Sequence, residues 1–480
     1  MKKIITVIYT LSFVIGAVSA QSVYDGVKIA DKDLNGTARF VGMGGAMGAL
    51  GGDITTMGTN PAGIGIYRSN DVMTSFSYSA YGMESKYEGQ KSTIDKNRWS
   101  FDNIGVVFAT KIGNQTPLRY VNFGFNYKRS KSFYKNMSMS GMMGVVENPS
   151  NPGSPYYVSQ TNSMALQATD AERYVWDNSR QHLDFDNANR IFSDPDAGWL
   201  GALGYQGGLT ERDRIDNEPD LYVPFLPVEP SSVFNSREKG GIDQYDFNVS
   251  FNINDRVYLG LTIGAYDVDY DKYSGYDESY KRGEGYSLES YNNISGSGFD
   301  VKMGLILRPF EYSPFRIGFA VHTPTFYKLT YSTSAIVTND YRDAKTDELK
   351  RIIVDTYDYV GDMKRDYRLV TPWKYNVSLG YTVVTSLALG AEYEYEDYST
   401  MKFKYSSNDG GGDMEFENAE VKNCLKGEHT FRIGAEYKVI PEFAFRLGYN
   451  YSSAVFRDEA VKYIPSNSLI TCLLYTSPSP

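Results

Sequence analysis

The sequence predicts an all-β fold, a transmembrane antiparallel β-barrel with an N-terminal hatch inside its lumen. Three features predict it: an export signal at the start of the chain, a glycine-dense segment soon after it, and many segments in which apolar and polar residues alternate strictly. Alternation with a period of two is the pattern of a β-strand with one apolar face. These features divide the chain into a leader, a hatch and a barrel wall.

The first twenty residues have the composition of a secretory signal peptide. A pair of lysines precedes an apolar run over residues 4–18, and Val-Ser-Ala stands before Gln21. Because residue 21 is not a cysteine, no lipid attachment site is expected. Cys424 and Cys472 are the only cysteines, so no disulfide framework is expected either. We predict a signal peptide over residues 1–20 and export of the mature chain.

Composition excludes several classes of protein. No later run reaches the roughly 18 to 20 apolar residues that a membrane helix needs. Aromatic residues make up 15% of the chain, with 41 tyrosines, and there are 45 glycines, which suits a barrel with aromatic girdles and a polar lumen. A net charge of -10 does not favour nucleic-acid binding. No nucleophile elbow or Ser/His spacing is visible, so we predict a non-enzyme without cofactor or metal.

The glycine-dense segment lies between Gly36 and Gly65 and holds ten glycines interleaved with apolar residues. Such a density permits positive φ and close backbone contacts, and the apolar residues argue against a flexible linker. A dinucleotide fingerprint fails because Met47 stands where its third glycine is required, and no lysine supplies a phosphate loop. We predict a compact irregular hatch over residues 21–66.

Strict alternation marks the wall. From Phe443 to Tyr451 the odd positions are Phe, Phe, Leu, Tyr and Tyr, whereas the even positions between them are Ala, Arg, Gly and Asn. Residues 430–439, 387–396 and 374–383 repeat the pattern. Each track has about the ten residues that a tilted strand needs to cross a bilayer. A soluble sandwich also alternates, but short turns between long polar loops favour a barrel.

Eleven strands are expected in a barrel wall over residues 67–465, with boundaries uncertain by ~2 to 4 residues. They are placed near residues 71–88, 98–111, 119–138, 242–253, 256–273, 287–308, 315–337, 366–384, 387–406, 420–439 and 443–457. Bacterial barrels have even strand numbers, so an odd count leaves bare edges. The final residues, 466–480, are expected to be an atypical tail that neither pairs as a central strand nor closes the wall. We predict that the native chain continues for about three more strands; a genuine short tail is the alternative.

The glycine-dense segment with Asn60-Pro61-Ala62, and the later tracks TPWKYNVSLGYTVVTSLALGAEYEYE and HTFRIGAEYKVIPEFAFRLGYNYSSAVF, resemble the FadL/TodX family of outer-membrane transporters for hydrophobic compounds. The resemblance implies a fourteen-stranded barrel plugged by a hatch, and passive uptake of long-chain fatty acids or similar molecules. It implies capture by outer loops, passage past the hatch and lateral exit. Expected partners are the hydrophobic ligand, outer-membrane lipid, lipopolysaccharide and the insertion machinery, for a monomer located in the outer membrane.

The expected site follows from these assignments. The triplet Asn60, Pro61 and Ala62 either stiffens the hatch or is only a turn into the first strand. Ligand contact is expected at hatch positions and at two tryptophans: Phe40, Val41, Met43, Met47, Leu50, Trp176 and Trp199. Lumen charges are expected at Arg432, Arg446, Lys438 and Glu436, where the arginines either form ion pairs or bind a ligand carboxylate.

A long extracellular insertion, residues 142–239, departs from the family pattern. It contains one helical prediction, residues 163–177, and a run of aromatic residues. These either form an outer apolar surface that collects ligand or pack on one another. Five acidic residues between Asp267 and Glu278 form either a divalent cation site or, as favoured, a solvated rim.

Two alternative functions stay open. A haem receptor needs axial ligands, and the three histidines, His182, His322 and His429, are widely separated, although tyrosines also serve. A barrel with a mainly structural or adhesive surface is the other alternative. Energy-coupled receptors have about 22 strands, more than this chain supplies.

Overall fold

The computed structural model describes most of the chain from Val23 onward. The predicted signal peptide lies outside the described residues. The described ranges are 23–87, 90–146, 156–157, 159–194, 197–215, 217–225, 230–383, 386–440, 443–458 and 469–478.

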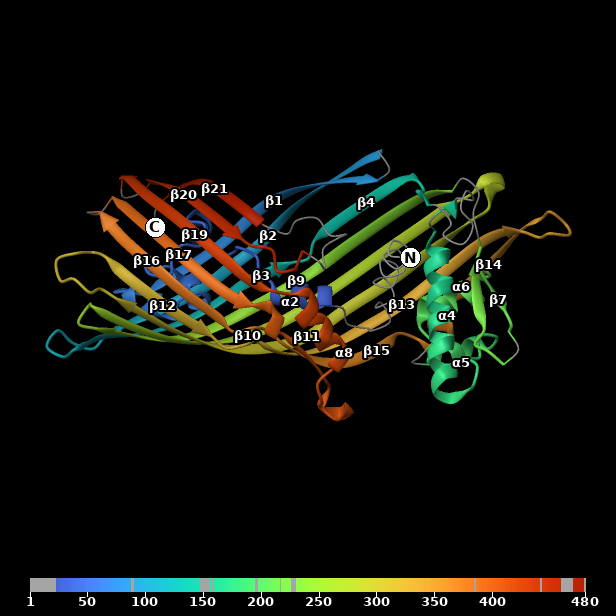
Figure 1. Ribbon diagram of the computed structural model, residues 1–480. Coiled ribbons are helices and arrows are strands. Elements are labelled where there is room, and N and C mark those ends of the chain that lie inside the picture. The colour runs from blue at the N-terminus through green and yellow to red at the C-terminus, as the bar shows by residue number, and fades with distance from the viewer. Residues whose placement is uncertain are drawn as a thin grey trace.

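One large antiparallel sheet of seventeen strands forms the wall (Figure 1). Consecutive strands pair as hairpins along most of the sheet. Among the described residues, β1 pairs only with β2 and β21 pairs only with β20, so these two strands end the series; the short strands β4, β14 and β18 likewise have one partner each. The strands of this sheet are β1 Asp71–Tyr87, β2 Gln90–Lys111, β3 Leu118–Ser132, β4 Lys135–Met142, β9 Ser231–Ile253, β10 Val257–Ser279, β11 Gly285–Leu307, β12 Arg316–His322, β13 Phe326–Arg342, β14 Leu349–Asp355, β15 Met363–Val370, β16 Lys374–Val383, β17 Leu387–Asp397, β18 Lys402–Tyr405, β19 Gly427–Ile440, β20 Phe443–Ser452 and β21 Leu469–Pro478.

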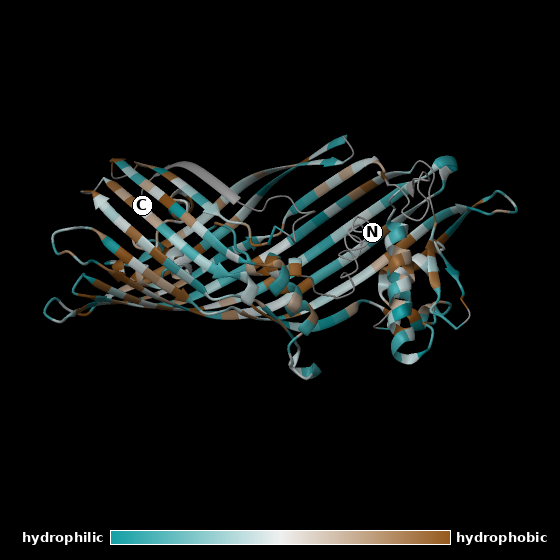
Figure 2. Cartoon of the chain, in the orientation of Figure 1, coloured by the Kyte–Doolittle hydropathy of each residue, from teal (hydrophilic) through white to brown (hydrophobic). Residues whose placement is uncertain are grey.

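The two faces of the wall show which side is apolar. On β19 and β20, Ile433 is 61% exposed and Leu447 is 52% exposed, whereas Glu436 and Arg446 are 2% and 1% exposed. Figure 2 shows the same alternation of hydrophobic and hydrophilic residues along the strands. Apolar side chains therefore point out of the sheet and polar ones point in. This is the reverse of a soluble sandwich, so the barrel-type sheet that the alternation predicts is confirmed.

Of three neighbouring long strands, β9 begins eleven residues before its predicted start, β10 ends six residues past its predicted end, and β11 agrees with the prediction to within two residues. The strands β9, β10 and β11 have 23 residues each, and about ten residues are enough to cross a bilayer. The predicted start of β9 at residue 242 was wrong because residues 231–241 are mostly polar or glycine and so show no apolar track. The insertion consequently ends before Ser231, not at residue 239.

Prolines interrupt the wall at two adjacent positions. β12 and β13 are separated at Pro324, and β15 and β16 are separated at Pro372, where single strands were predicted. Proline has no N–H to donate to the ladder, so the strands break there. A hydrogen bond joins the two interrupted segments, because Thr325 N–H donates to Thr371 Oγ1 at 2.8 Å.

Two further predicted strands need correction. The strand predicted over residues 387–406 is interrupted by the short helix η5, Tyr398–Thr400. The strand predicted from residue 420 begins at Gly427, because Glu415–Cys424 is the helix α8. Beyond β20, residues 469–478 pair with Ser452 through Phe443. This pairing is at an edge of the sheet, and the expectation excluded only pairing as a central strand and closure of the wall.

The insertion folds as a small helical module, residues 156–225, at the end of the long strands (Figure 1). Its first helix confirms the helical prediction. Its core packs on Tyr286, Val337 and Val354 of the wall. None of the described helices combines the length and hydropathy needed to cross a lipid bilayer. The elements of the module and its flank are β5 Val145–Val146, β6 Tyr156–Tyr157, α4 Gln160–Ser179, α5 Ala188–Ser193, α6 Trp199–Gln206, β7 Thr210–Asp213 and β8 Leu221–Pro224.

A buried carboxylate anchors this module to β10. Glu278 is 2% exposed and accepts hydrogen bonds from Ser159 Oγ at 2.8 Å and from the Gln160 N–H at 3.2 Å, at the start of α4. The hydroxyls of Tyr276 and Tyr286 also donate to it, at 2.6 and 2.9 Å. Burial, and then the charge of Glu278, raise the pKa of Tyr286. The prediction of a solvated rim was therefore wrong for Glu278.

Candidate functional site

The glycine-dense segment lies against the inner face of the wall. It folds into α3 Ala38–Gly42 and two 3-10 helices, η2 Ile54–Gly58 and η3 Pro61–Ile66, and the helix α2, Val23–Ala30, precedes it in the predicted hatch. Aspartate 53 caps η2, and its carboxylate accepts hydrogen bonds from Thr55 N–H at 2.9 Å and Thr37 Oγ1 at 2.6 Å. Side-chain caps of this kind accept hydrogen bonds from backbone N–H groups that have no partner within such short helices.

Asn60 ties two parts of this segment together and faces the wall. Its side chain caps η3 by accepting from Ala62 N–H at 3.2 Å, and its Nδ2 donates to Gly48 O at 2.9 Å. Pro61 occupies the first position of η3, where its fixed φ suits the turn. The triplet therefore begins a turn and also links two parts of the hatch, and the two interpretations given for it are compatible.

A belt of glycines on the inner face of the wall admits the hatch backbone. A methyl group at Gly448 would lie 2.1 Å from Gly44 N, and one at Gly390 would lie 2.1 Å from Ala46 O. Directly opposed pairs carry the belt across neighbouring strands: Gly260 with Gly304, Gly380 with Gly390, Gly390 with Gly434, and Gly434 with Gly448. No other residue type leaves room for backbone at this distance.

Sequence reasoning missed this belt, although its signal was present. Glycine recurs once per strand at inward positions, directly after an apolar residue, as in SLG, ALG, RIG and RLG. The prediction grouped these glycines with polar residues as one face. Their shared register across strands is what distinguishes them.

Three of the four predicted lumen charges form ion pairs with wall residues or with the hatch, and the fourth, Lys438, is half-buried on β19. Arg432 donates to Glu392 at 2.7 Å and to Glu394 at 3.0 Å, and Arg446 donates to Glu436 at 2.6 Å. Glu436 also binds Arg39 of the hatch at 3.0 Å. Both arginines are thus held by wall carboxylates, the first of the two roles expected for them.

The predicted hatch residues divide into two groups. Met43, Met47 and Leu50 are buried in a small core with Phe40 and Ala388, and they line neither of the two cavities described next. Val41 is half-buried and lines both cavities, and Phe40 lines one. Of the five positions, Val41 is therefore the one placed best for ligand contact.

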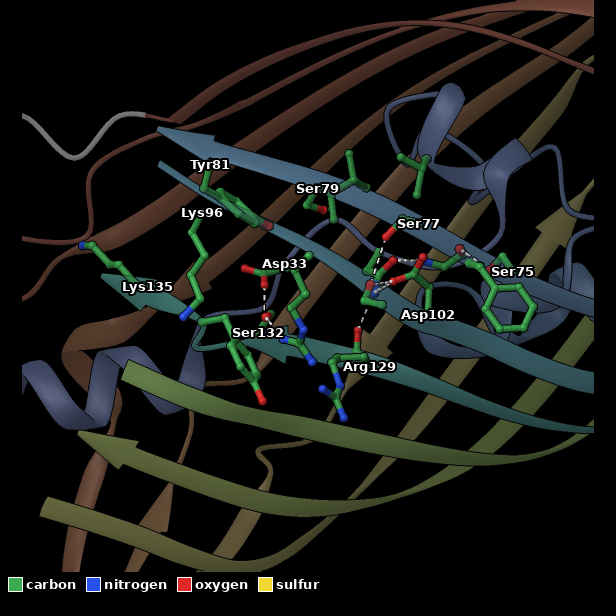
Figure 3. A pocket seen from close by; sticks show the side chains of 18 of the residues that line it. Asp33, Ser75, Ser77, Ser79, Tyr81, Lys96, Asp102, Arg129, Ser132 and Lys135 are labelled. Atoms are coloured by element: carbon green, nitrogen blue, oxygen red, sulfur yellow. Dashed lines mark hydrogen bonds between the residues drawn. The ribbon is translucent and has the colours of Figure 1, made fainter. Parts of the chain in front are cut away.

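The first cavity, which we call the edge cavity, has a volume of about 600 Å³ and lies between the hatch and strands β1 to β4 (Figure 3). Its apolar lining includes Leu34, Val41, Phe76 and Ile94. Figure 3 shows a row of serines and Asp102 across from Asp33 and Arg129. The lining is thus amphipathic, within the size range of small-molecule sites.

A β-bulge shapes this cavity. Ser75 opposes Asn103 and Phe76 opposes Phe101, so Asp102 is the extra residue on β2. The bulge turns Asp102 inward, where it is 4% exposed and accepts from Ser100 Oγ at 2.5 Å. Bulges of this kind re-aim side chains next to sites.

The second cavity, the lumen cavity, has a volume of about 810 Å³ and adjoins the first. The two share five lining residues: Asp33, Leu34, Asn35, Val41 and Tyr81. Its lining also includes Phe40 and the ion-paired Arg432 and Glu394. Lys128, also in the lining, is 7% exposed, and none of the described carboxylates lies within ion-pair distance of it. Lys128 was not predicted.

The predicted tryptophans lie in the helical module and are not brought together with the hatch residues. Trp199 donates from Nε1 to Phe192 O at 3.0 Å and packs against the module core. Trp176 packs against the ring of His182, with centroids 4.7 Å apart. Their contacts match the alternative of a loop packing on itself.

The three histidines are engaged separately. His322 Nε2 lies 2.7 Å from Thr59 O of the hatch, and His429 Nδ1 lies 2.8 Å from Tyr393 Oη. His182 Nδ1 lies 2.6 Å from Glu172 Oε1. The three imidazoles thus contact three different segments of the chain.

The sequence matches no family profile and no curated protein. Among solved structures, the chain is similar to the toluene transporter TbuX of Ralstonia pickettii, at 12% identity over 88% of each chain and a TM-score of 0.39. A FadL homologue of Pseudomonas aeruginosa is 12% identical over 89% of this chain and 82% of its own, with a TM-score of 0.42. The toluene transporter TodX of P. putida is 10% identical over 88% of this chain and 84% of its own, with a TM-score of 0.40. FadL and TodX name the family that the sequence resembles; the function proposed below rests on the residues and cavities of this chain.

Proposed function

We propose that the protein is an outer-membrane transporter for the passive uptake of hydrophobic small molecules such as long-chain fatty acids. The observation that carries the proposal is the pair of adjoining cavities between the hatch and the wall, which share five residues. The apolar outer face and the charged inner face of the wall support the location of this protein in a lipid bilayer. The chain acts as a monomer, contacts lipopolysaccharide and depends on the barrel-insertion machinery.

The route follows the two cavities. A ligand enters from the outer end, occupies the lumen cavity beside Phe40 and Val41, and passes into the edge cavity. The edge cavity is bordered by the edge strand β1, so exit is sideways into the membrane. An apolar ligand gains about 0.8 kcal/mol per methylene when it leaves water, which favours lateral exit over an aqueous path.

Lys128 is the residue that binds the polar end of an amphiphilic ligand in this proposal. Its ammonium group is buried in the lining of the lumen cavity, and a buried cation is stabilised by an anion at hydrogen-bond distance. Arg432 and Arg446 are less suitable because wall carboxylates already hold them. A fatty-acid carboxylate at Lys128 leaves its chain beside Phe40 and Val41.

The test is uptake by cells that express Val41→Trp. The larger ring fills the space that both cavities share, so we expect most of the uptake of labelled oleate and of labelled toluene to be lost at unchanged surface expression. Tyr312→Trp is the matched control, since Tyr312 is 97% exposed in the turn before β12. Unchanged uptake by Val41→Trp would remove the route through the shared space.

Lys128→Met separates the ligand classes. It removes the cation and keeps a side chain of similar length, so we expect slower uptake of oleate and unchanged uptake of neutral toluene. Equal loss for both ligands would mean that Lys128 supports the fold and does not bind a carboxylate.

A further inference from the structure

Two carboxylates and an imidazole converge at the surface of the helical module. Glu172 comes from α4, His182 from the loop after it, and Asp220 from the loop before β8. One ligand atom from each lies within 4.8 Å of the other two. His182 Nδ1 is 2.6 Å from Glu172 Oε1 and 3.8 Å from Asp220 Oδ2. We propose that these three residues form a binding site for a divalent transition-metal ion of the Zn²⁺ class.

The charge balance favours a cation at this point. The side chains of Glu172 and Asp220 are 0% and 8% exposed, and buried carboxylates need compensation. Arg212 lies 3.8 Å from Asp220 but binds Asp186 more closely, at 2.5 Å. Hydrogen bonds from Tyr205 and Arg212 lower the pKa of Asp186, so that carboxylate competes for the guanidinium.

A buried hydroxyl beside the cluster supplies a second, independent observation. Tyr222 is 4% exposed, and its hydroxyl lies near the Arg212 guanidinium without a hydrogen bond of good geometry to any of the described residues. Buried polar atoms in native proteins are nearly always paired. A water molecule on a metal ion at this cluster supplies the missing partner.

The donor set fits the Zn²⁺ class. One imidazole nitrogen and two carboxylate oxygens, with water in the fourth position, make an open tetrahedral site, whereas Ca²⁺ and Mg²⁺ prefer oxygen alone. Bonds of about 2.0–2.1 Å place tetrahedral ligands roughly 3.3 Å apart. The pair Glu172 and His182 therefore opens by a fraction of an ångström, which the partly exposed His182 side chain permits.

The surroundings orient the first ligand. The N–H of Leu183 donates to Glu172 Oε2 at 3.0 Å, which leaves Oε1 directed at His182. Outer hydrogen bonds of this kind fix ligand carboxylates in metal sites. The bound ion joins α4, the following loop and the loop before β8, three segments separate in sequence, and so stiffens the module.

The test uses the full-length protein in detergent after removal of metal by a chelator. Calorimetric titration with zinc chloride should show one ion bound per chain. His182→Asn and Glu172→Gln should each weaken binding by at least about tenfold. His429→Asn is the matched control, because His429 lies on β19, outside the helical module, and its Nδ1 is 2.8 Å from Tyr393 Oη.

Trp176 provides a readout at the site itself. Its ring lies 4.7 Å from the His182 ring, so Co²⁺ bound there should quench its fluorescence, and Trp176→Phe should remove that quenching while zinc binding persists. A proteolysis pattern equal to that of the parent protein should show that the module of His182→Asn is folded. Absence of zinc binding by the parent protein, or binding that His182→Asn leaves unchanged, would overturn the proposal and leave a histidine–carboxylate ion pair.

Discussion

Gly448→Val is expected to expel the hatch from the wall. A methyl group at this position would lie 2.1 Å from Gly44 N, and Gly44 itself has a φ of +63°, so neither backbone has room to retreat. The cost should exceed the ~1–3 kcal/mol of an ordinary overpacked site, because backbone and not a side chain is in the way. We expect a variant that still inserts but conducts ions in planar bilayers and admits large hydrophilic antibiotics.

Gly412→Val is the control for that experiment. Nothing lies within 4 Å of a methyl group at Gly412, which is in the exposed turn before α8. It should therefore leave conductance and stability unchanged. If Gly448→Val conducts no more than Gly412→Val, the hatch does not depend on the glycine belt.

Lys302→Met is expected to be the most destabilising single charge removal in the wall. Lys302 is fully buried and binds Asp246 at 2.9 Å and Asp300 at 2.8 Å, and both carboxylates are buried as well. Removing the cation leaves two buried anions without compensation, which costs about 3–5 kcal/mol. Urea unfolding in lipid vesicles, followed by tryptophan fluorescence, measures the loss.

Two further variants decide the cause. The triple variant Lys302→Met, Asp246→Asn, Asp300→Asn should recover most of the lost free energy, because it removes the anions along with the cation. Arg351→Met, which breaks an exposed pair with Asp340, should have no measurable effect. A triple variant no more stable than Lys302→Met would assign the loss to packing and not to charge.

The alternation of residue types predicted the wall well because it is a local signal. Each side chain on a strand such as β20 is apolar or polar according to the face it occupies, so Phe445 and Arg446 reveal their sides without any knowledge of neighbours. The first part of β9 escaped this signal. Residues 231–241 are mostly polar or glycine, so no apolar track marks them.

The candidate site was less predictable because it depends on contacts between distant segments. Val41 and Lys128 line one cavity although 87 residues separate them, as their numbers show, and no local pattern links them. Met43 and Met47 were equally apolar in sequence, yet packing against Ala388 removes them from the cavities. Residue type alone does not separate a ligand-facing side chain from one that packs the hatch.

The metal-ligand cluster illustrates the same limit. His182 follows Glu172 by ten residues, but Asp220 joins them only because β7 and β8 fold back beside α4. No metal-ligand spacing is therefore visible in the sequence, and no metal was predicted.

The central claim is that the tracks of the wall face lipid while the hatch lies inside. Tryptophan quenching by brominated acyl chains tests it most directly, with single tryptophans placed in a chain whose four native tryptophans are phenylalanine. Leu447→Trp, on the outer face of β20, should be strongly quenched, and Val41→Trp, beside the lumen cavity, should not be. Equal quenching of the two, or quenching of Val41→Trp alone, would contradict the account.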